Sequence, residues 1–400
     1  MSKKISSESL LKNTWIKDLS VFIIFLCALI FWSPVIPALT NIMTSWLYLP
    51  ALSVLSITLI INRVSIKILI LMLMLLLMLL SVALFINDYY FIRFISIPIA
   101  IFASFYAIKS RYILDKLCSF MTIFAIVACV CSIVGFIYAL SGADYSFSII
   151  NPDGRENYFY LTTFTNYVRG TIIRPSFIYD EPGALSFVLC SICFLRLVLR
   201  RPIKTTFIIL MLGVITLSLA HLIILILTFI FYSNLKSKIL LLVISLIIIS
   251  VTITDSRFSF FYSRFEITED GLKGDNRSEQ VENFLEVVDI DLILFGNYRC
   301  MKDKSICESH GDISSSIVSP AYNGGLMLLI VQLFIHLILV LAMILRPNKV
   351  TISVSLMLFL LLLQRPYFHM MGYQIFIFMI TFLLINQSLI RNRYRLNNNE

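Results

Sequence analysis

The run TTFIILMLGVITLSLAHLIILILTFIFY, residues 205–232, decides how this chain folds. Its 28 residues are nearly all apolar, but they are too many for one membrane helix and too few for two, because one crossing needs about 20. Basic residues stand on both sides of the run, with Arg201 before it and Lys236 after it. Because basic residues in short loops stay on the inner side of a membrane, the run must cross outward and return. We therefore expect a short broken hairpin with its break near Ser218–His221, a geometry that membranes tolerate where the tip is buried in protein.

The composition of the whole chain agrees with a membrane location. Apolar residues make up 59% of the chain and charged residues 14%, whereas soluble proteins average roughly 45–50% and about 25%. Repeated apolar runs of about 20 residues are typical of membrane helices. The net charge of +9 comes from short basic pairs between these runs, not from one basic stripe, so no nucleic-acid partner is expected.

Basic residues elsewhere in the chain indicate one consistent orientation. If both termini and every short basic connection lie inside, the inner side holds 20 of the 32 Lys and Arg residues but 4 of the 23 Asp and Glu residues, which satisfies the positive-inside rule. The first apolar run lacks a clear cleavage site, so we expect an uncleaved first helix. The sequence therefore predicts an all-α polytopic membrane protein, with a single membrane domain over residues 1–400, about 12 membrane segments and both termini cytoplasmic.

Two long polar segments, residues 141–182 and 255–315, become large external loops in this topology. In the second loop, Asn276 is placed to cap a helix and Glu279 occupies the matching capping-box position. Apolar residues follow at i, i+3, i+4 and i+7 spacing, which predicts an amphipathic helix at about 277–290.

Four arginines fall on the outer side in this topology, namely Arg169, Arg174, Arg277 and Arg365. A guanidinium group presents a planar fork that matches phosphate oxygens and stays charged at any relevant pH. The alternative for each arginine is a structural ion pair with an outer carboxylate. The four arginines are therefore candidates for binding a phosphate or diphosphate group.

Two residues are candidates for a general base. Glu181 precedes Pro182 and a new apolar run, and a carboxylate at such a low-dielectric boundary can accept a proton. Its alternative role is to cap the helix that begins there. His310 stands between Glu308 and Asp312, which could orient its ring. Its alternative is an ordinary loop histidine.

Aromatic residues are frequent in the first loop, Tyr167 and Tyr179 among them. Rings of this kind can stack on sugar faces. They also form interfacial belts at membrane surfaces without any ligand. The two tyrosines are thus candidates for contact with a glycan, with the belt as the alternative.

Two further patterns lie in the second loop. Cys300 and Cys307 could close a short disulfide if the loop faces an oxidising compartment. Asp289 and Asp291 spell the DxD of metal-dependent sugar transferases, but no further ligands stand nearby in the sequence. We expect no metal site here.

Five stretches together resemble a known family. They are RPSFIYDEPGALSFVLC (174–190), LGVITLSLAHLIILIL (212–227), DNRSEQVENFLEVVDIDLILFG (275–296), AYNGGLMLLIVQLF (321–334) and LLLQRPYFHMMGY (361–373). Their order and their placement relative to the helices resemble the bacterial O-antigen polymerases, which are related in fold to O-antigen ligases and the C-type glycosyltransferases. The resemblance covers most of the chain.

This resemblance implies a glycosyl transfer at the periplasmic face of the bacterial inner membrane, without a metal or another cofactor. A growing glycan on undecaprenyl diphosphate would be the donor, and a hydroxyl of the next lipid-linked repeat unit would attack its anomeric carbon. Arg174, Arg277 and Arg365 would hold the leaving diphosphate. Glu181 or His310 would accept the hydroxyl proton, and the first-loop aromatics would line the glycan path.

The partners implied are the undecaprenyl-diphosphate-linked oligosaccharide, membrane lipids and a regulator of chain length. Two alternatives remain open from the sequence. A lipid-linked oligosaccharide flippase or similar transporter would carry charged residues in its bundle and short loops. An O-antigen ligase, which transfers finished polymer to the lipid A core, is separated only weakly from a polymerase by sequence.

Overall fold

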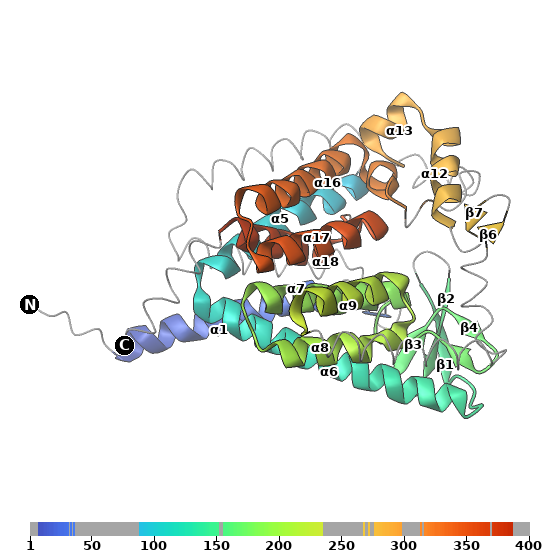
Figure 1. Cartoon of the computed structure of the whole chain (residues 1–400), viewed down its shortest axis with the longest axis horizontal. Helices are drawn as coiled ribbons and strands as arrows, with labels where there is room; N and C mark the ends of the chain where they lie inside the picture. The colour runs from blue at the N-terminus through green and yellow to red at the C-terminus, as the bar shows by residue number, and fades with distance from the viewer. Residues whose placement is uncertain are drawn as a thin grey trace, which may run out of the picture. The chain divides into compact units, whose positions relative to one another are not determined.

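The computed structural model describes residues 7–31, 33, 35–36, 88–151, 155–234, 267–268, 271–272, 276–297, 313, 316–368 and 370–386. In this part the chain is mostly helical (Figure 1). It forms two compact units, one of Met1–Leu217 with His369–Glu400 and one of Ser218–Phe368. Each unit is described in turn.

The first unit is a helical bundle in which two helices, Pro182–Val198 and Met371–Ile385, are almost completely buried. Its helices are α1 (Ser7–Leu29), α5 (Asp88–Lys109), α6 (Arg111–Leu140), α7 (Pro182–Val198), α8 (Ile203–Gly213), the 3-10 turn η1 (Val214–Thr216) and α18 (Met371–Ile385). α18 packs against α5, α7 and α1, and α6 packs against α1, α7 and α8. Every residue of α7 is buried, as expected of a helix that is apolar on all sides.

The predicted break in the run 205–232 is confirmed. α8 ends at Gly213, η1 ends at Thr216, and Leu217 adopts a left-handed conformation with a φ of 49°. α9 (Leu219–Tyr232) then begins after Ser218. The break lies immediately before the predicted interval 218–221, because Leu217 is the residue that leaves helical geometry.

The expectation of an all-α chain is wrong in residues 141–182. This segment forms five short strands, β1 (Phe147–Ile150), β2 (Glu156–Tyr160), β3 (Thr163–Thr165), β4 (Val168–Arg169) and β5 (Ile172–Ile173). β1, β2 and β3 make an antiparallel sheet in that order, and β4 pairs with β5. Tyr, Phe, Ile and Thr dominate these strands, and aromatic and β-branched residues are the ones that fit a pleated surface.

The three-stranded sheet is seated on the end of α6. On one face, Tyr160 packs with Ala139 of α6 and with Ile173. Gly135 of α6 lies so close that a Cβ there would be 2.7 Å from the Tyr160 carbonyl oxygen and would overlap the Thr163 side chain. The missing side chain at this glycine therefore lets the sheet approach the helix backbone directly.

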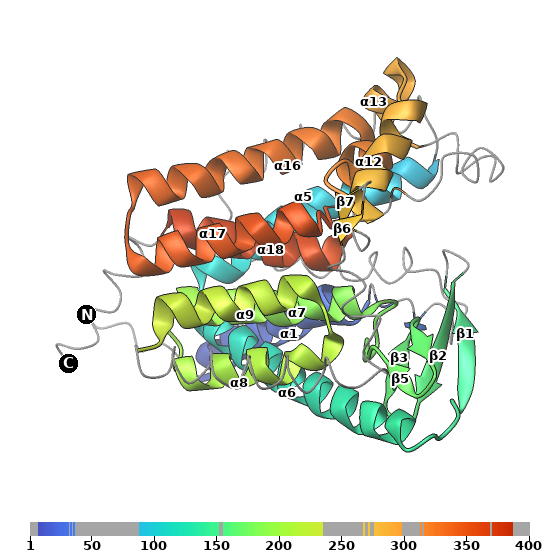
Figure 2. The same ribbon diagram turned by 45° about the vertical axis from the view of Figure 1, so that its right-hand side comes forward.

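The second unit contains α9, α12 (Asn276–Val287), α13 (Ile290–Phe295), α16 (Ser319–Leu345) and α17 (Lys349–Gln364), with a small pair of strands, β6 (Ile267–Thr268) and β7 (Gly271–Leu272). α16 packs against α17 and α13, and α17 packs against α9; Figure 2 shows α13 beside one end of α16. Phe284 of α12 and Leu292 of α13 are buried in one apolar cluster with Tyr322 of α16.

The amphipathic helix predicted at about 277–290 is interrupted. α12 ends at Val287, and Asp289 caps the following helix α13 by accepting a hydrogen bond from the Leu292 amide at 2.6 Å. One carboxylate of the DxD tripeptide thus has a structural role as a helix cap.

α16 is kinked at two glycines, and the kink contacts a third glycine just after α13. Gly324 and Gly325 leave helical geometry, and Gly325 has a φ of 59°. A Cβ on Gly296, just after α13, would lie 2.8 Å from the Gly325 amide nitrogen. The backbones of the two segments therefore touch, and the Asn297 amide donates a 2.7 Å hydrogen bond to the Tyr322 carbonyl across this contact.

Two of the described helices, α6 and α16, are long and apolar enough to cross a membrane, judged by length and composition. The expected count of about 12 segments is not supported. Several other described apolar helices have only 10–17 residues, and the runs within 37–87 and 235–266 lie outside the described residues.

Both long helices expose an apolar stripe. On α6 it comprises Ile123, Val127, Val130, Val134 and Ile137, and on α16 Ile330, Leu333, Phe334, Leu337, Leu341 and Ile344. Residues spaced three and four apart share one side of a helix. Each helix therefore turns one continuous hydrophobic side away from the protein.

Candidate functional site

Arg174 lies between β5 and α7 and reaches the break in the run 205–232. Its Nε donates to the Thr216 carbonyl at 3.3 Å and its Nη2 to the Leu217 carbonyl at 3.1 Å. These are carbonyls that the end of a helix leaves without intrahelical partners. The guanidinium carbon also lies 5.5 Å from the centre of the Tyr167 ring. Arg174 thus holds the helix break beside the sheet and places a positive charge there.

The carboxylates of Asp180 and Glu181 meet an arginine that the sequence did not single out. Arg155, at the start of β2, lies 3.7 Å from an Asp180 oxygen and 3.8 Å from a Glu181 oxygen. Glu181 is the residue that precedes α7, but its side chain makes no capping hydrogen bond. Glu181 therefore occupies the N-cap position of α7, as the alternative had it, but its side chain does not cap the helix. Its carboxylate is directed into an ion-pair cluster instead.

Two buried asparagines lie beside this cluster. Asn157 of β2 is fully buried, and its Nδ2 donates to the Tyr179 carbonyl at 3.3 Å. Asn151 is 3% exposed, and its amide donates to the Arg155 carbonyl at 2.9 Å. In the part of the chain that the structure describes, the Asn157 Oδ1 and both polar side-chain atoms of Asn151 make no hydrogen bond. Asn151 and Asn157 thus bring three unbonded buried polar atoms next to the two carboxylates, although other described residues also contain single atoms of this kind.

The two candidate tyrosines differ in exposure. Tyr179 is fully buried, its hydroxyl donates to the Leu29 carbonyl at 3.1 Å, and burial raises the pKa of this phenol well above its usual value. The expectation that Tyr179 contacts a glycan is therefore wrong, because the loop folds back onto α1 and places the ring in the core. Tyr167 is partly exposed and lies under the Arg174 guanidinium.

The remaining candidates are distributed as follows. Arg169 is exposed on β4 opposite Ile172. Arg365 follows α17 and its Nη1 donates to the Tyr367 hydroxyl. Arg277 belongs to the first turn of α12. Arg365 and Arg277 belong to the second unit, whereas Arg169, Arg174 and Glu181 belong to the first. His310, Cys300 and Cys307 lie outside the described residues.

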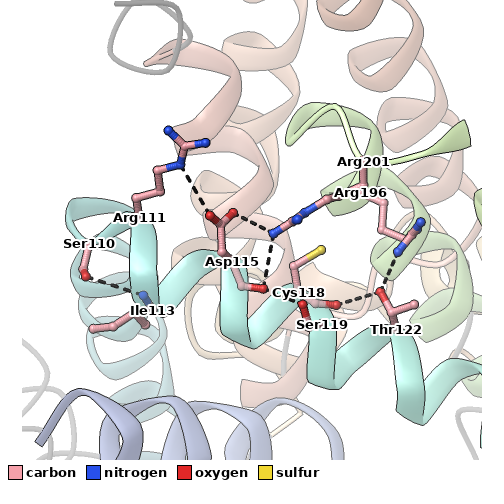
Figure 3. A network of polar contacts seen from close by, with 9 residues as sticks. All are labelled: Ser110, Arg111, Ile113, Asp115, Cys118, Ser119, Thr122, Arg196 and Arg201. Atoms are coloured by element: carbon pink, nitrogen blue, oxygen red, sulfur yellow. Dashed lines mark hydrogen bonds and ion pairs between the residues drawn. The ribbon is translucent and has the colours of Figure 1, made fainter. Parts of the chain in front are cut away.

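A second polar region lies at the other ends of α6 and α7 (Figure 3). Arg196 is 5% exposed near the end of α7. Its Nη1 donates to Thr122 Oγ1 at 2.8 Å, its Nε to Thr206 Oγ1 at 3.2 Å and its Nη2 to the Pro202 carbonyl at 3.1 Å. This arginine therefore ties α6, α7 and α8 together.

Asp115 of α6 extends the same region. Its Oδ1 lies 2.7 Å from Arg201 Nη2 and its Oδ2 lies 3.4 Å from Arg111 Nε. Both ion pairs are seen beside Arg196 in Figure 3. The basic groups Arg111, Lys116, Arg196 and Arg201 outnumber the carboxylates that lie beside them in the described residues, Asp18 and Asp115, so this end of the bundle is positively charged.

The sheet end therefore gathers two carboxylates, two buried amides and the guanidinium groups of Arg155 and Arg174. Amides and carboxylates hydrogen-bond hydroxyl groups, and guanidinium groups bind phosphate. Among the described residues, no group of three or more His, Cys, Asp or Glu side chains is close enough to hold a metal ion. Comparisons with protein-family models, with curated proteins and with solved structures found no match to this chain.

Proposed function

We propose that this protein is a polymerase that joins undecaprenyl-diphosphate-linked O-antigen repeat units by glycosyl transfer. One observation carries the proposal. At one end of an apolar helical bundle, Glu181, Asp180, two buried asparagines and two arginines gather on a small sheet. Such a set combines groups for hydroxyls, for a transferred proton and for phosphate.

The membrane arrangement follows from charge and from exposed surface. The apolar stripes on α6 and α16 are suited to contact lipid. Arg111, Arg196 and Arg201 mark the cytoplasmic end of α6 and α7 by the positive-inside rule. The sheet at the opposite end of α6 then belongs to the periplasmic side. In this proposal the chain has about 12 segments in the inner membrane and both termini in the cytoplasm.

The chemistry uses residues of the sheet end. A hydroxyl of the acceptor sugar attacks the anomeric carbon of the donor, a new C–O bond forms, and the bond from that carbon to the diphosphate oxygen breaks. The hydroxyl proton passes to the Glu181 carboxylate, or to His310 if that residue is the base. The diphosphate leaves with the bonding electron pair and is stabilised by Arg174, while Arg277 and Arg365 remain separate candidates for this role. In this proposal the acceptor is the Glu181 carboxylate, which lies 3.8 Å from an Arg155 nitrogen.

Deletion of the gene with profiling of lipopolysaccharide tests the proposal. Loss of a polymerase leaves core that carries a single repeat unit, and a plasmid copy restores the ladder of longer chains. Loss of all capped core indicates a flippase or a ligase and contradicts polymerase activity. The ligase is then identified by accumulation of undecaprenyl-linked polymer, which a flippase defect does not produce.

A further inference from the structure

Three polar residues share one face of the small sheet. In the β1–β2 register Ile149 lies opposite Asn157, and Asn151 bonds to Arg155. Because side chains alternate between faces every second residue, Asn151, Arg155 and Asn157 project from the same face as Ile149. That face is the one opposite Tyr158 and Tyr160, the side chains that pack toward α6.

The hydrogen bond of Asn157 shows which polar atom of its side-chain amide has no hydrogen-bond partner. A carbonyl accepts only from a donor, so the Nδ2 group must face the Tyr179 carbonyl and Oδ1 must point elsewhere. Oδ1 of Asn157 is therefore a buried acceptor, and Asn151 adds one buried acceptor and one buried donor. Each such atom lowers stability when nothing bonds to it. Proteins retain such local conflicts mainly at functional or strained sites.

The surroundings define the chemistry of a fitting ligand. Asp180 and Glu181 add carboxylate oxygens next to Arg155. An anion such as phosphate is disfavoured by these two carboxylates. A neutral ring with several hydroxyls is suited to the set, because each hydroxyl can donate to an amide or carboxylate oxygen while it accepts from Asn151 or Arg155.

We propose that Asn151 and Asn157 form a subsite that binds the hydroxyl groups of the acceptor sugar next to Glu181. This inference rests on the proposed function, because it names where one of the two substrates of that reaction is recognised. The subsite is distinct from the arginines that hold the diphosphate. It positions the sugar and takes no part in bond making.

Saturation-transfer NMR on the purified full-length protein in nanodiscs tests the subsite. The probes are the methyl glycosides of N-acetylglucosamine, galactose and rhamnose. Asn157→Leu and Asn151→Leu keep similar volume and remove the amide, so each variant is expected to lower the saccharide signal about tenfold. Asn151→Leu is also expected to raise the midpoint of thermal unfolding because it removes two unbonded polar atoms, whereas Asn157→Leu also loses the hydrogen bond to the Tyr179 carbonyl and should change the midpoint less. Tyr158→Phe, on the opposite face of β2, is the matched control and should leave the signal unchanged.

Full saccharide signal in both leucine variants overturns the subsite, as does the absence of signal from the native protein for all three probes. If a leucine variant fails to fold, the saccharide signal of Asn151→Ser is measured instead, because serine is small and polar but too short to make the contact. An undiminished signal in this variant overturns the subsite. If deletion of the gene abolishes the lipopolysaccharide ladder but both leucine variants bind the saccharides normally, the subsite is rejected and the polymerase proposal stands. If the leucine variants lose saccharide binding but deletion of the gene leaves lipopolysaccharide unchanged, the polymerase proposal is rejected and the subsite stands.

Discussion

Buried polar groups at the two ends of α6 and α7 differ in their hydrogen bonding. At one end, the buried Arg196 guanidinium makes three hydrogen bonds, to α6, to α8 and to the residue before α8. At the other end, the buried amides of Asn151 and Asn157 keep atoms that bond to nothing in the described chain. A buried charge without partners is far more costly than a buried amide without partners. The comparison therefore separates an end where buried polar groups join helices from an end where buried polar atoms are left without partners, which is the end that we propose binds a ligand.

Glu181→Gln probes the sheet end with the largest expected effect. Glutamine keeps the shape of the side chain but cannot accept a proton, so polymer formation should fall about 10²–10⁴-fold. Ladder formation in a complemented deletion strain measures this, with protein abundance checked by immunoblot. Asp180→Asn is the matched control because it changes the other carboxylate that Arg155 contacts. Normal ladders from Glu181→Gln would assign the base to another residue, with His310 as the next to change.

Arg196→Met probes the end where buried polar groups join helices. The change removes three hydrogen bonds made by a buried charged group and leaves their neutral partners in place, so we expect the free energy of unfolding to fall by about 1.5–3 kcal/mol. Thermal unfolding of the purified protein measures the loss. Arg200→Met, at an exposed neighbouring position, should have little effect. Equal stability of the two variants would mean that the Arg196 network does not hold the helices together.

Gly135→Ala tests whether the sheet must be seated tightly on α6. The added methyl group would meet Thr163 and the Tyr160 carbonyl, and overpacking of this kind costs about 1–3 kcal/mol. Thr163→Ser removes the methyl group that clashes, so the double variant should recover part of the stability. A double variant no better than Gly135→Ala would show that the contact with the Tyr160 backbone dominates.

Tyr179→Phe has the smallest expected effect. It removes one hydrogen bond to the Leu29 carbonyl and should lower the free energy of unfolding by about 1 kcal/mol. Ladder length should stay normal because the ring is buried and meets no substrate. Short ladders at unchanged stability would return Tyr179 to the glycan path.

Sequence reasoning located the features that depend on neighbouring residues. The break at Leu217 followed from the length of one apolar run and the charges beside it. The start of α12 at Asn276 followed from a capping pattern four residues long. Both depend on local spacing, which is visible in one sequence.

Features that depend on folding back of the chain were missed. Residues 141–182 were assigned to a loop because they are polar, although the aromatic and β-branched content of 156–165 favours strands. Arg155 pairs with Glu181 only because the sheet brings β2 beside the segment before α7. The burial of Tyr179 depends on its contact with α1, 150 residues earlier in the chain. No local pattern encodes such distant neighbours.

The length of α6 determines the depth at which the proposed reaction takes place. Its 30 residues span about 45 Å at 1.5 Å per residue, whereas the hydrocarbon layer of a bilayer is about 30 Å thick. A helix anchored by Arg111 and Asp115 at the inner boundary thus extends about 15 Å beyond the outer one and carries the sheet with it. In the proposed membrane arrangement, the length of α6 therefore sets the height of the sheet relative to the bilayer. The helix holds the carboxylates and amides at and just beyond the headgroup layer, which is roughly 5–8 Å deep on each side, where the sugar of a lipid-linked substrate extends from its anchor.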